Sequence, residues 1–546
     1  MKSLAYPQKN LWEKIQEKSQ INFVKKTFYA LTLISAISIH SMANAENSMT
    51  YALKGSPHSL DPFTMYDIST HSFNGNIYEP LVDRNAHLEL VPCLATEWKN
   101  IDPTTWRFNL RQNVKFHDGE IFTAKDVIFS FERISGAGSA LATAVASIKE
   151  IKMIDDYTID VITKTPHPIL PSELFAMFIF SKSWAEKNNA TKVPDITKKE
   201  VGFADNHTNG TGPYKLESYQ PEEKIVLTKN NDWWGTERGN IDKAIFIPIA
   251  SDATRVAALV SGKVDLIAPV PLQDIEHLTK DPKLAVIEAP SLLTTFLGMN
   301  QGDDKLKSCN LDKNPFKDQR VREAFEYAID IEAIKTKIMR GYAEPNGLLI
   351  VKGVNGYDQN INTRRKFDLQ KAKKLMVEAG YPNGFNLAMD CSNDRYTNDA
   401  MICQSIAQML SKINVKINLT AQTKSKFFGK VFGLDSDFYM LGWLPTTYDA
   451  HNAYYNLVAT RSGEQGQYNV GGYSNPKVDA LIDQIQKEMD PTKRNQMLIE
   501  VMKIAQEEVA NIPLHQEKFV YGVNKRLKNP QIRADDMINI KDFNVQ

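Results

Sequence analysis

Two hydrophobic periods alternate along the chain. Strand-like stretches place an apolar residue at every second position, and helix-like stretches place apolar residues three and four positions apart. The strand pattern occurs at residues 49–55, 105–119, 385–391, 415–422 and 437–443. The helical pattern occurs at residues 123–134, 318–341, 367–384, 398–413, 478–489 and 494–510. Their alternation predicts an α/β fold with mixed sheets flanked by helices.

A β-α-β unit is predicted in the second half of the chain. FNLAMDC (385–391) alternates as a strand, NDAMICQSIAQMLSKI (398–413) carries an apolar helical face, and VKINLTAQ (415–422) alternates again. Strands joined by such a crossover are parallel. The turn SNDRYT (392–397) therefore lies at the carboxyl edge of the sheet, where open α/β sheets bind ligands.

A second edge of this kind follows the strand DFYMLGW (437–443). A polar and aromatic loop begins after Trp443 and contains Tyr448, Asp449 and His451. We expect this loop to contribute to the same ligand-binding edge.

The N-terminus has the pattern of a secretory signal peptide. Residues 1–26 hold six lysines and two glutamates, hence a net charge of +4, and an apolar run follows at 27–39. Ala43-Asn44-Ala45 completes the pattern, so cleavage is expected after Ala45. An N-terminal membrane anchor is the alternative, but the apolar run is short for a bilayer crossing. The sequence predicts an exported protein.

Composition narrows the possible function classes. Hydrophobic residues make up 42% of the 546 residues, charged residues make up 24%, and the formal net charge is zero. This balance does not favour binding to nucleic acid or to an anionic membrane. The sequence lacks GxSxG, HExxH, P-loop and GxGxxG motifs, so we do not expect an enzyme.

The four cysteines do not form a metal-binding or thioredoxin-type motif, because no CxxC occurs. Cys391 and Cys403 bracket the turn at 392–397, and an oxidising compartment would permit a disulfide between them. Two buried free thiols are the alternative. The histidines are isolated in sequence, and we expect neither a metal nor a cofactor.

Several strings, in order, resemble the peptide/nickel family of bacterial extracellular solute-binding proteins, the receptors of ABC importers. The strings are LDPF (60–63), NIYEPLVDRN (76–85), VPCLATEW (91–98), WRFNLRQNVKFHDGEIFTAKDVIFSFER (106–133), GTGPYKL (210–216) and NPFKDQRVREAFEYAID (314–330). The resemblance extends over nearly all of residues 50–525, and the block at 106–133 is its most specific part.

The resemblance implies a two-lobed periplasmic-binding-protein clamshell with an extra subdomain in the larger lobe. We expect a signal peptide at 1–45, a first lobe at 46–296 with the subdomain around 82–220, and a second lobe at 297–512. Residues 513–546 would return to the first lobe. The chain would cross the hinge near 294–300 and near 511–517.

The resemblance also implies a site for a short, dipeptide-like peptide. Arg395 matches the carboxylate-binding arginine of dipeptide receptors, and its charge suits a buried carboxylate. The alternative is a solvated turn arginine paired with Asp394 or Asp399. Asp449 lies where peptide receptors carry an amine-binding aspartate, although His451 replaces the second acid of that pattern. A loop cap is the alternative for Asp449.

Further candidate ligand contacts come from aromatic and polar residues. Trp443, Tyr448 and Tyr396 are expected to form walls of the site, with core packing as the alternative. Thr64 and Tyr66 are expected to approach the ligand from the other lobe. The predicted function is a monomeric periplasmic receptor that delivers its peptide to an inner-membrane permease. Haem, nickel chelates, glutathione and opines are the alternative ligands.

Overall fold

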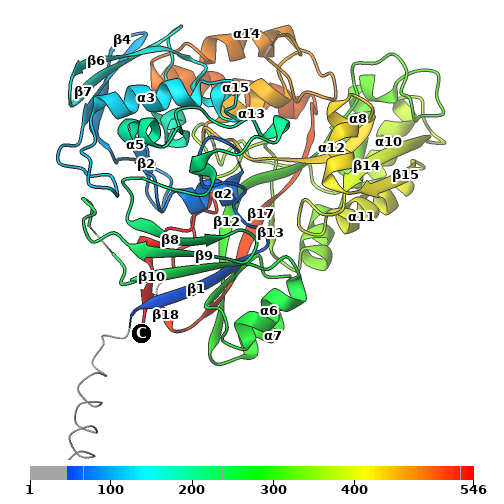
Figure 1. The fold of residues 1–546 in the computed structure, drawn as a ribbon. Coiled ribbons are helices and arrows are strands. Elements are labelled where there is room, and N and C mark those ends of the chain that lie inside the picture. Colours follow the sequence, from blue (N-terminus) through cyan, green and yellow to red (C-terminus); the bar gives the residue numbers. More distant parts are fainter. Residues whose placement is uncertain (1–45, 66, 237, 464, 529) are drawn as a thin grey trace, which may run out of the picture. The chain divides into compact units, whose positions relative to one another are not determined.

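The computed structural model describes residues 46–65, 67–236, 238–463, 465–528 and 530–546 (Figure 1). The predicted signal peptide, residues 1–45, lies outside the described residues. The chain divides after Ser48, and the unit Met49–Gln546 holds the sheets and helices that carry the candidate site. Among the described helices, none is both long enough and apolar enough to cross a membrane.

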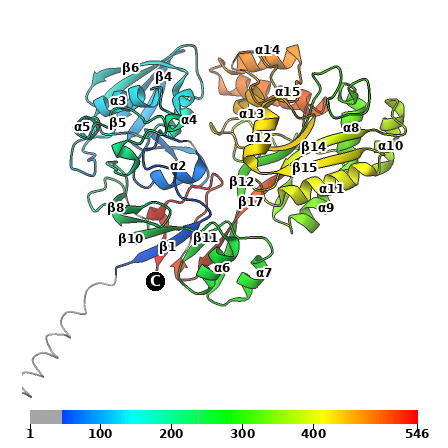
Figure 2. The ribbon, with the colours of Figure 1, turned by 45° about the vertical axis from the view of Figure 1, so that its right-hand side comes forward.

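A large mixed sheet forms the framework of the second unit (Figure 2). Its strand order is β15-β14-β16-β12-β17-β11-β1-β10-β9-β8, and β13 pairs with β17 beside this path. The strands are β1 (Ser48–Leu53), β8 (Tyr214–Gln220), β9 (Lys224–Lys229), β10 (Lys243–Pro248), β11 (Leu266–Ala268), β12 (Leu284–Met299), β13 (Ala343–Pro345), β14 (Asn386–Ser392), β15 (Lys416–Gln422), β16 (Phe438–Trp443) and β17 (Ile512–Asn524). Parallel pairs (β14 with β15 and β16) and antiparallel pairs (β12 with β16 and β17) both occur, which confirms the predicted mixed α/β class.

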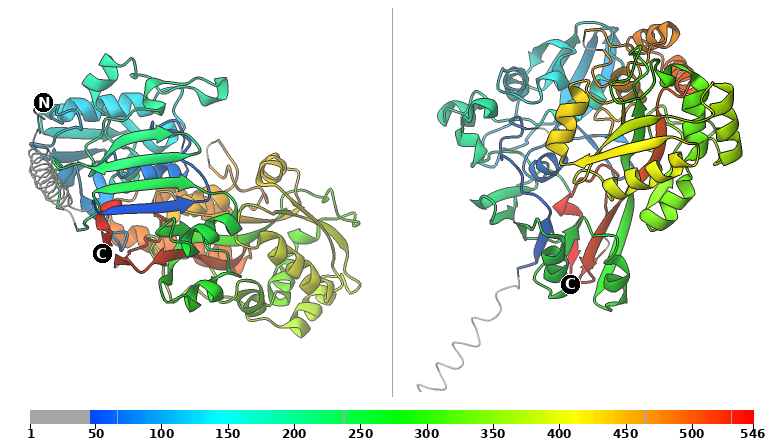
Figure 3. Two further views of the ribbon diagram at one scale, coloured as in Figure 1. Left: turned by 60° about the horizontal axis from the view of Figure 1, so that its bottom comes forward. Right: turned by 90° about the vertical axis from the view of Figure 1, so that its right-hand side faces the viewer.

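The long strands β12 and β17 connect the two ends of this sheet. On one side of the pair lie β14, β15 and β16, and on the other lie β1, β8, β9 and β10, which run side by side in Figure 3. The pairing of β12 with β17 shifts register between Pro290 and Thr294 and again between Thr295 and Phe296. Such irregularities bend a strand locally. The predicted hinge crossings lie largely within these two strands, and their role as hinges stays a prediction.

The predicted β-α-β unit is confirmed. β14 and β15 pair in parallel from Asn386–Lys416 to Ser392–Gln422, and α11 (Asp399–Ser411) connects them. The apolar face of α11 is buried at Ile402, Ile406 and Leu410. These side chains share a core with both cysteines of the bracketed turn.

A four-stranded antiparallel sheet forms earlier in the chain, in the order β4-β5-β7-β6. Its strands are β4 (Ala95–Asp102), β5 (Thr105–Leu110), β6 (Ile148–Asp155) and β7 (Thr158–Thr163). The neighbouring helix α3 (Ala124–Ile134) lies within the helical pattern predicted at 123–134, and its N-cap Thr123 forms a capping box with Asp126. The sheet lies within the range predicted for an extra subdomain, whose bounds stay a prediction.

The prediction of one helix over 318–341 is wrong. α8 (Gln319–Ala328) ends where Ile329 adopts an extended backbone, and Asp330 caps a new helix, α9 (Ile331–Ala333). The Ala333 amide donates to the Asp330 carboxylate at 3.0 Å. A π-helical turn, η6 (Ile334–Ile338), follows. The hydrophobic period continues across this break because residues on both sides pack into the same core.

Shorter elements complete the fold. The remaining α-helices are α2 (Ile68–Asn74), α4 (Leu170–Glu173), α5 (Lys182–Lys187), α6 (Asp252–Val260), α7 (Ile275–Lys280), α10 (Leu369–Glu378), α12 (Lys424–Phe432), α13 (Ala450–Leu457), α14 (Pro476–Ile485) and α15 (Pro491–Glu507). The 3-10 helices are η1 (Ala142–Val145), η2 (Leu174–Ala176), η3 (Ile196–Lys198), η4 (Phe203–Asp205), η5 (Pro315–Lys317) and η7 (Ile540–Asp542). Two small sheets pair β2 (Val82–Arg84) with β3 (Leu90–Pro92) and β18 (Leu527–Lys528) with β19 (Asn544–Val545).

Candidate ligand-binding site

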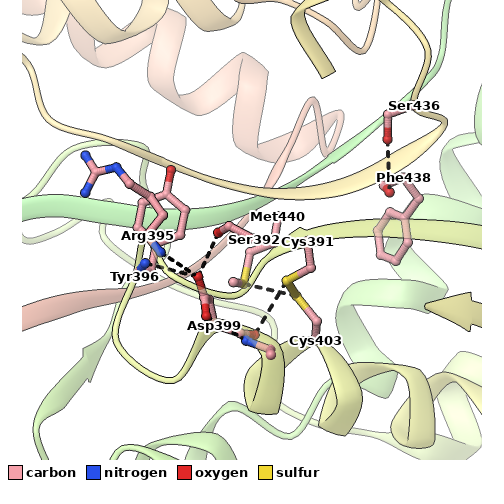
Figure 4. Close-up of a disulfide and its surroundings, with 10 residues drawn as sticks. Cys391, Ser392, Arg395, Tyr396, Asp399, Cys403, Ser436, Phe438 and Met440 are labelled. Carbon is pink, nitrogen blue, oxygen red and sulfur yellow. Dashed lines mark hydrogen bonds between the residues drawn. A yellow bond between two sulfur atoms is a disulfide. The ribbon is translucent and has the colours of Figure 1, made fainter. Parts of the chain in front are cut away.

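The turn from β14 to α11 is organised by one buried carboxylate (Figure 4). One Asp399 oxygen accepts hydrogen bonds from the Ser392 hydroxyl at 2.8 Å and from the backbone amides of Arg395 and Tyr396 at 3.1 and 3.2 Å. These bonds satisfy backbone donors that the turn leaves outside regular structure. Asp399 therefore fixes the backbone from which the Arg395 side chain extends.

A disulfide joins the two ends of this turn. Cys391 near the end of β14 is bonded to Cys403 in α11, with their Cα atoms 6.6 Å apart. Both residues are fully buried. The cross-link restrains the intervening segment, which contains Arg395, in addition to the hydrogen bonds of Asp399.

The Arg395 side chain is exposed. Neither of the acids considered as a partner is bound to its guanidinium group: Asp399 accepts from its backbone amide, and Asp394 accepts from the Lys424 amide at 2.6 Å. Among the described residues, its side chain contacts the ring of Tyr396, with Cζ 5.1 Å from the ring centroid. The guanidinium group is therefore available to an anion from outside the protein.

Glu517 of β17 lies in the electrostatic field of Arg395 and was not predicted from the sequence. Its side chain is buried, with the residue 8% exposed, and it accepts hydrogen bonds from Thr397 Oγ1 at 3.0 Å and Thr295 Oγ1 at 3.4 Å. Burial raises the pKa of Glu517 to about 6, although the Thr397 hydrogen bonds and the Arg395 charge act in the opposite direction. A single acid inside the apolar strand NIPLHQEKFVYG is the signal that could have identified it.

Tyr396 connects the turn to the neighbouring strand β16. The residue is 7% exposed, and its hydroxyl oxygen accepts a hydrogen bond from the Gly442 amide at 2.8 Å. Burial raises the pKa of Tyr396 to about 12. A side chain at position 442 would collide with this ring, because a Cβ atom there would lie 2.6 Å from Tyr396 Cε1. Most of the Tyr396 ring therefore packs in the core.

Trp443 ends β16 and is only partly buried. Its indole nitrogen donates to Asn452 Oδ1 at 3.0 Å, and its ring lies 5.1 Å from the ring of Tyr468. Trp443 directly follows Gly442, whose amide donates to the Tyr396 hydroxyl. These contacts bring Trp443 and the Arg395 turn to the same edge of the sheet, as predicted.

Asp449 has a full set of hydrogen bonds from the protein. One oxygen accepts from Arg494 at 2.7 Å and Asn355 at 2.7 Å, and the other accepts from Arg494 at 2.8 Å and the His451 amide at 2.9 Å. Burial opposes ionisation, but the hydrogen bonds and charge of Arg494 hold the pKa of Asp449 below its usual value. The residue is the N-cap of α13. A ligand ammonium could reach this carboxylate only if one of these donors left.

His451 follows Asp449 in α13 and is 9% exposed. Burial lowers its pKa to about 4, with a further contribution from the Arg494 charge, so the imidazole is neutral near pH 7. Its ring packs 5.2 Å from the ring of Tyr455. Its predicted contact with a ligand stays a prediction.

Tyr448 is buried between segments that lie far apart in the sequence. Its hydroxyl donates to Asp535 Oδ2 at 2.8 Å, and its ring lies 3.9 Å from Arg84 Cζ and 5.7 Å from the ring of Phe175. Tyr448 therefore joins the loop after β16 to N-terminal and C-terminal parts of the chain.

The candidates from the N-terminal part of the chain are not brought to Arg395 by any described contact. Thr64 is 3% exposed, and its hydroxyl donates to Asp205 Oδ1 at 3.4 Å. Tyr66 lies outside the described residues. Among the described residues, no group of three or more His, Cys, Asp or Glu side chains is arranged to hold a metal ion.

Comparison with known proteins agrees with this architecture. The chain is 27% identical over 526 residues to the glutathione-binding protein GsiB of Pectobacterium atrosepticum, covering 93% of this chain and 96% of the relative. It is 26% identical to the periplasmic binding protein DppA of Helicobacter pylori, solved with the peptide STSA, with a TM-score of 0.72 and coverage of 90% of this chain and 97% of that one. The substrate-binding protein CtaP of Listeria monocytogenes shares the fold at 19% identity, with a TM-score of 0.80 and coverage of 92% and 99%.

The family assignment follows from a match over more than half of the chain. Residues 89–465 match the family described as bacterial extracellular solute-binding proteins, family 5 Middle. Members of this family bind solutes and are not enzymes. The chain belongs to family 5 of the bacterial extracellular solute-binding proteins and is a substrate-binding receptor of an ABC importer.

Proposed function

We propose that this receptor captures short peptides or peptide-like molecules that carry both a carboxylate and an ammonium group. The observation that carries the proposal is the pair Arg395 and Glu517. The guanidinium group is exposed and has no acidic partner among the described residues, and the buried carboxylate lies within its electrostatic field. The two opposite charges are thus close enough for the Arg395 charge to act on the Glu517 carboxylate.

A zwitterionic ligand complements this pair of charges. Arginine binds a carboxylate through two parallel hydrogen bonds, which gives both affinity and orientation. An ammonium group that loses water on binding needs an anionic partner, because an unpaired buried charge costs several kcal/mol. We assign the ligand carboxylate to Arg395 and the ligand ammonium to Glu517.

We assign the ammonium to Glu517 rather than to Asp449, the acid predicted from the sequence, because the two carboxylates differ in hydrogen bonding. Asp449 accepts four donors, two of them from a bidentate arginine. Glu517 accepts from two threonine hydroxyls and from the Thr397 backbone, and none of these donors is charged. A carboxylate has about four acceptor positions, so Glu517 retains capacity for an ammonium group.

Short peptides and glutathione both fit these charges. DppA of Helicobacter pylori was solved with the tetrapeptide STSA, and GsiB of Pectobacterium atrosepticum is a glutathione-binding protein. Glutathione also carries carboxylate and ammonium groups, and the curated relatives favour it as the second candidate. Haem and nickel chelates lack this zwitterionic pattern.

The transport cycle that we propose uses the predicted lobes, 46–296 with 513–546 and 297–512. The receptor is exported to the periplasm by its signal peptide, residues 1–45, which is cleaved off, and it acts there as a monomer. It binds its ligand between the lobes and closes about β12 and β17. The closed form then docks on the membrane permease. Closure excludes water and strengthens the charge pairs in a medium of lower dielectric constant.

Isothermal titration calorimetry tests the ligand class. The purified mature protein is titrated with dipeptides, tripeptides and oxidised or reduced glutathione, beside the variant Arg395→Gln. Loss of the guanidinium group should weaken carboxylate binding by about 2–5 kcal/mol, which corresponds to roughly 30-fold to 4,000-fold in Kd. The matched control is Lys412→Gln, which removes an exposed cation at the other end of α11.

The ligand controls separate the roles of the two charges. N-acetylated peptides should lose affinity in the wild type if Glu517 binds the ammonium, and C-terminal amides should lose affinity if Arg395 binds the carboxylate. Equal affinity of Arg395→Gln and wild type for an unmodified peptide would disprove the role of Arg395. Visible absorbance of haem or nickel in the purified protein, with no heat from peptides, would disprove the ligand class.

A further inference from the structure

A second polar site lies beside β13 and β17, at Arg364 and His515. All three guanidinium nitrogens of Arg364 and both imidazole nitrogens of His515 are buried and have no hydrogen-bond partner within the described residues. His515 is fully buried, whereas part of Arg364 outside its guanidinium nitrogens reaches solvent. Buried polar atoms are nearly always hydrogen-bonded in native proteins, so two such groups together indicate an occupant.

Backbone contacts bring the two residues together. His515 pairs with Pro345 in the β13–β17 ladder, and the Asn346 amide donates to the Leu514 carbonyl at 3.1 Å. The next residue, Gly347, lies directly against Thr363, because a Cβ atom at Gly347 would be 2.2 Å from the Thr363 carbonyl oxygen. Arg364 therefore leaves the backbone next to the segment that pairs with His515.

The segment that carries Arg364 is held in place by two side chains. Asn362 Oδ1 accepts from the Gly347 amide at 2.8 Å, and Gln506 Nε2 donates to the Gly347 carbonyl at 3.1 Å and to the Thr363 carbonyl. These bonds fix the backbone on both sides of the contact. The position of Arg364 is thus a property of the folded core and not of a free loop.

No acid contacts the Arg364 guanidinium group in the described structure. Glu326 is the acid whose charge acts on Arg364, but its carboxylate is bonded to Arg365 at 2.8 Å. Arginine keeps its charge in proteins, and a buried cation without a contacting partner is costly. Burial, with a further contribution from the Arg364 charge, lowers the pKa of His515 to about 4, which leaves a neutral imidazole with one N–H donor.

We propose that Arg364 and His515 form a buried site for a small monovalent anion of the halide type, built from side chains that the proposed peptide contacts do not use. The guanidinium group offers only donors, and the neutral imidazole adds one more. An anion at this position compensates the guanidinium charge and accepts hydrogen bonds from both side chains. Because all five nitrogens are buried, an ion that reaches them must be small and shielded from solvent.

Bromide locates the site directly. Crystals of the wild-type protein grown with sodium bromide should show an anomalous difference peak within hydrogen-bond distance of both the Arg364 guanidinium group and the His515 ring. The absence of a peak at these nitrogens overturns the proposal, because the nitrogens would then be hydrogen-bonded by water or by protein groups.

Thermal unfolding gives an independent measure in solution. At constant ionic strength, replacing gluconate by chloride should raise the Tm of the wild type with increasing chloride, since a ligand of the native state stabilises it. Arg364→Met should lose this chloride-specific increase, and Arg395→Gln should keep it. His515→Gln provides a second variant if Arg364→Met does not fold. An equal chloride response in the Arg364 or His515 variant overturns the proposal, as does loss of the response in Arg395→Gln.

Discussion

At the scale of single residues, two buried carboxylates show how hydrogen-bond donors and nearby charges set the protonation state of an acid. Asp449 receives four hydrogen bonds, and the charge of Arg494 favours its ionised form. Glu517 receives two hydrogen bonds from neutral hydroxyls, and burial favours its protonated form. The first acid is therefore suited to holding α13 in place, and the second is suited to exchanging a proton for a ligand cation.

The raised pKa of Glu517 predicts a pH-dependent gain in stability for Glu517→Gln. Between the unfolded pKa near 4.5 and the folded pKa of about 6, the native state binds the proton that the unfolded state has lost. The free energy of unfolding that Glu517 contributes therefore falls as the pH rises from near 4.5 to about 6 and above. The variant does not titrate, so it should be more stable than wild type by up to about 2 kcal/mol at pH 7.5, with no such gain at pH 4.

Urea unfolding at the two pH values measures this difference. Glu132→Gln, at an exposed helix position, serves as the control and should change stability little at either pH. A Glu517→Gln variant whose stability relative to wild type is the same at pH 4 and pH 7.5 would contradict the raised pKa.

Asp449→Asn should act mainly on stability. The substitution leaves Arg494, whose side chain is 4% exposed, without its charged partner. Removing one member of a buried ion pair typically costs about 3–5 kcal/mol. In the background of Arg494→Met the same substitution should cost much less, and denaturant unfolding of the four proteins gives this coupling energy. A folded, stable Asp449→Asn protein that no longer binds peptide would instead support the amine-binding role predicted from the sequence.

At the scale of elements, the turn at 392–399 is held by a carboxylate and a disulfide, and both restrain the segment that contains Arg395. Reduction of the disulfide, or the double variant Cys391→Ser with Cys403→Ser, should lower stability by about 3 kcal/mol. Alkylation of the denatured protein followed by mass spectrometry should find two free thiols before reduction, Cys93 and Cys309, and four after it. Four free thiols before reduction would contradict the cross-link.

Local patterns predicted most elements, although the strand pattern at 105–119 forms a strand only over Thr105–Leu110, and they predicted long-range contacts poorly. The β-α-β unit around the turn follows from periods that are visible over seven to sixteen residues. The break at Ile329 was missed because apolar residues continue on both sides of the Asp330 cap. Two of the four hydrogen bonds of Asp449 come from Arg494, and the hydroxyl donors to Glu517 are Thr295 and Thr397. Spacing along the chain contains no information on such partners.

At the scale of the molecule, the paired strands β12 and β17 connect the proposed ligand contact to both ends of the large sheet. These strands join the end of the sheet that carries Arg395 to the end formed by β1, β8, β9 and β10. Their register shifts at Pro290–Thr294 and Thr295–Phe296 lie beside Glu517, because Thr295 donates to its carboxylate. The proposed ligand contact is thus next to the point where the strands bend most readily.

Small-angle X-ray scattering tests whether ligand binding closes the molecule about these strands. A ligand that contacts both lobes shifts the population toward the closed form by its difference in affinity for the two forms. A peptide at a concentration well above its Kd should therefore reduce the radius of gyration of the wild type, with the mass of a monomer retained. Arg395→Gln should show no reduction at the same peptide concentration, whereas Lys412→Gln should respond as the wild type does. An unchanged radius of gyration, in a sample that calorimetry shows to be saturated, would mean that the peptide binds without closure, and the hinge assigned to β12 and β17 would then be wrong.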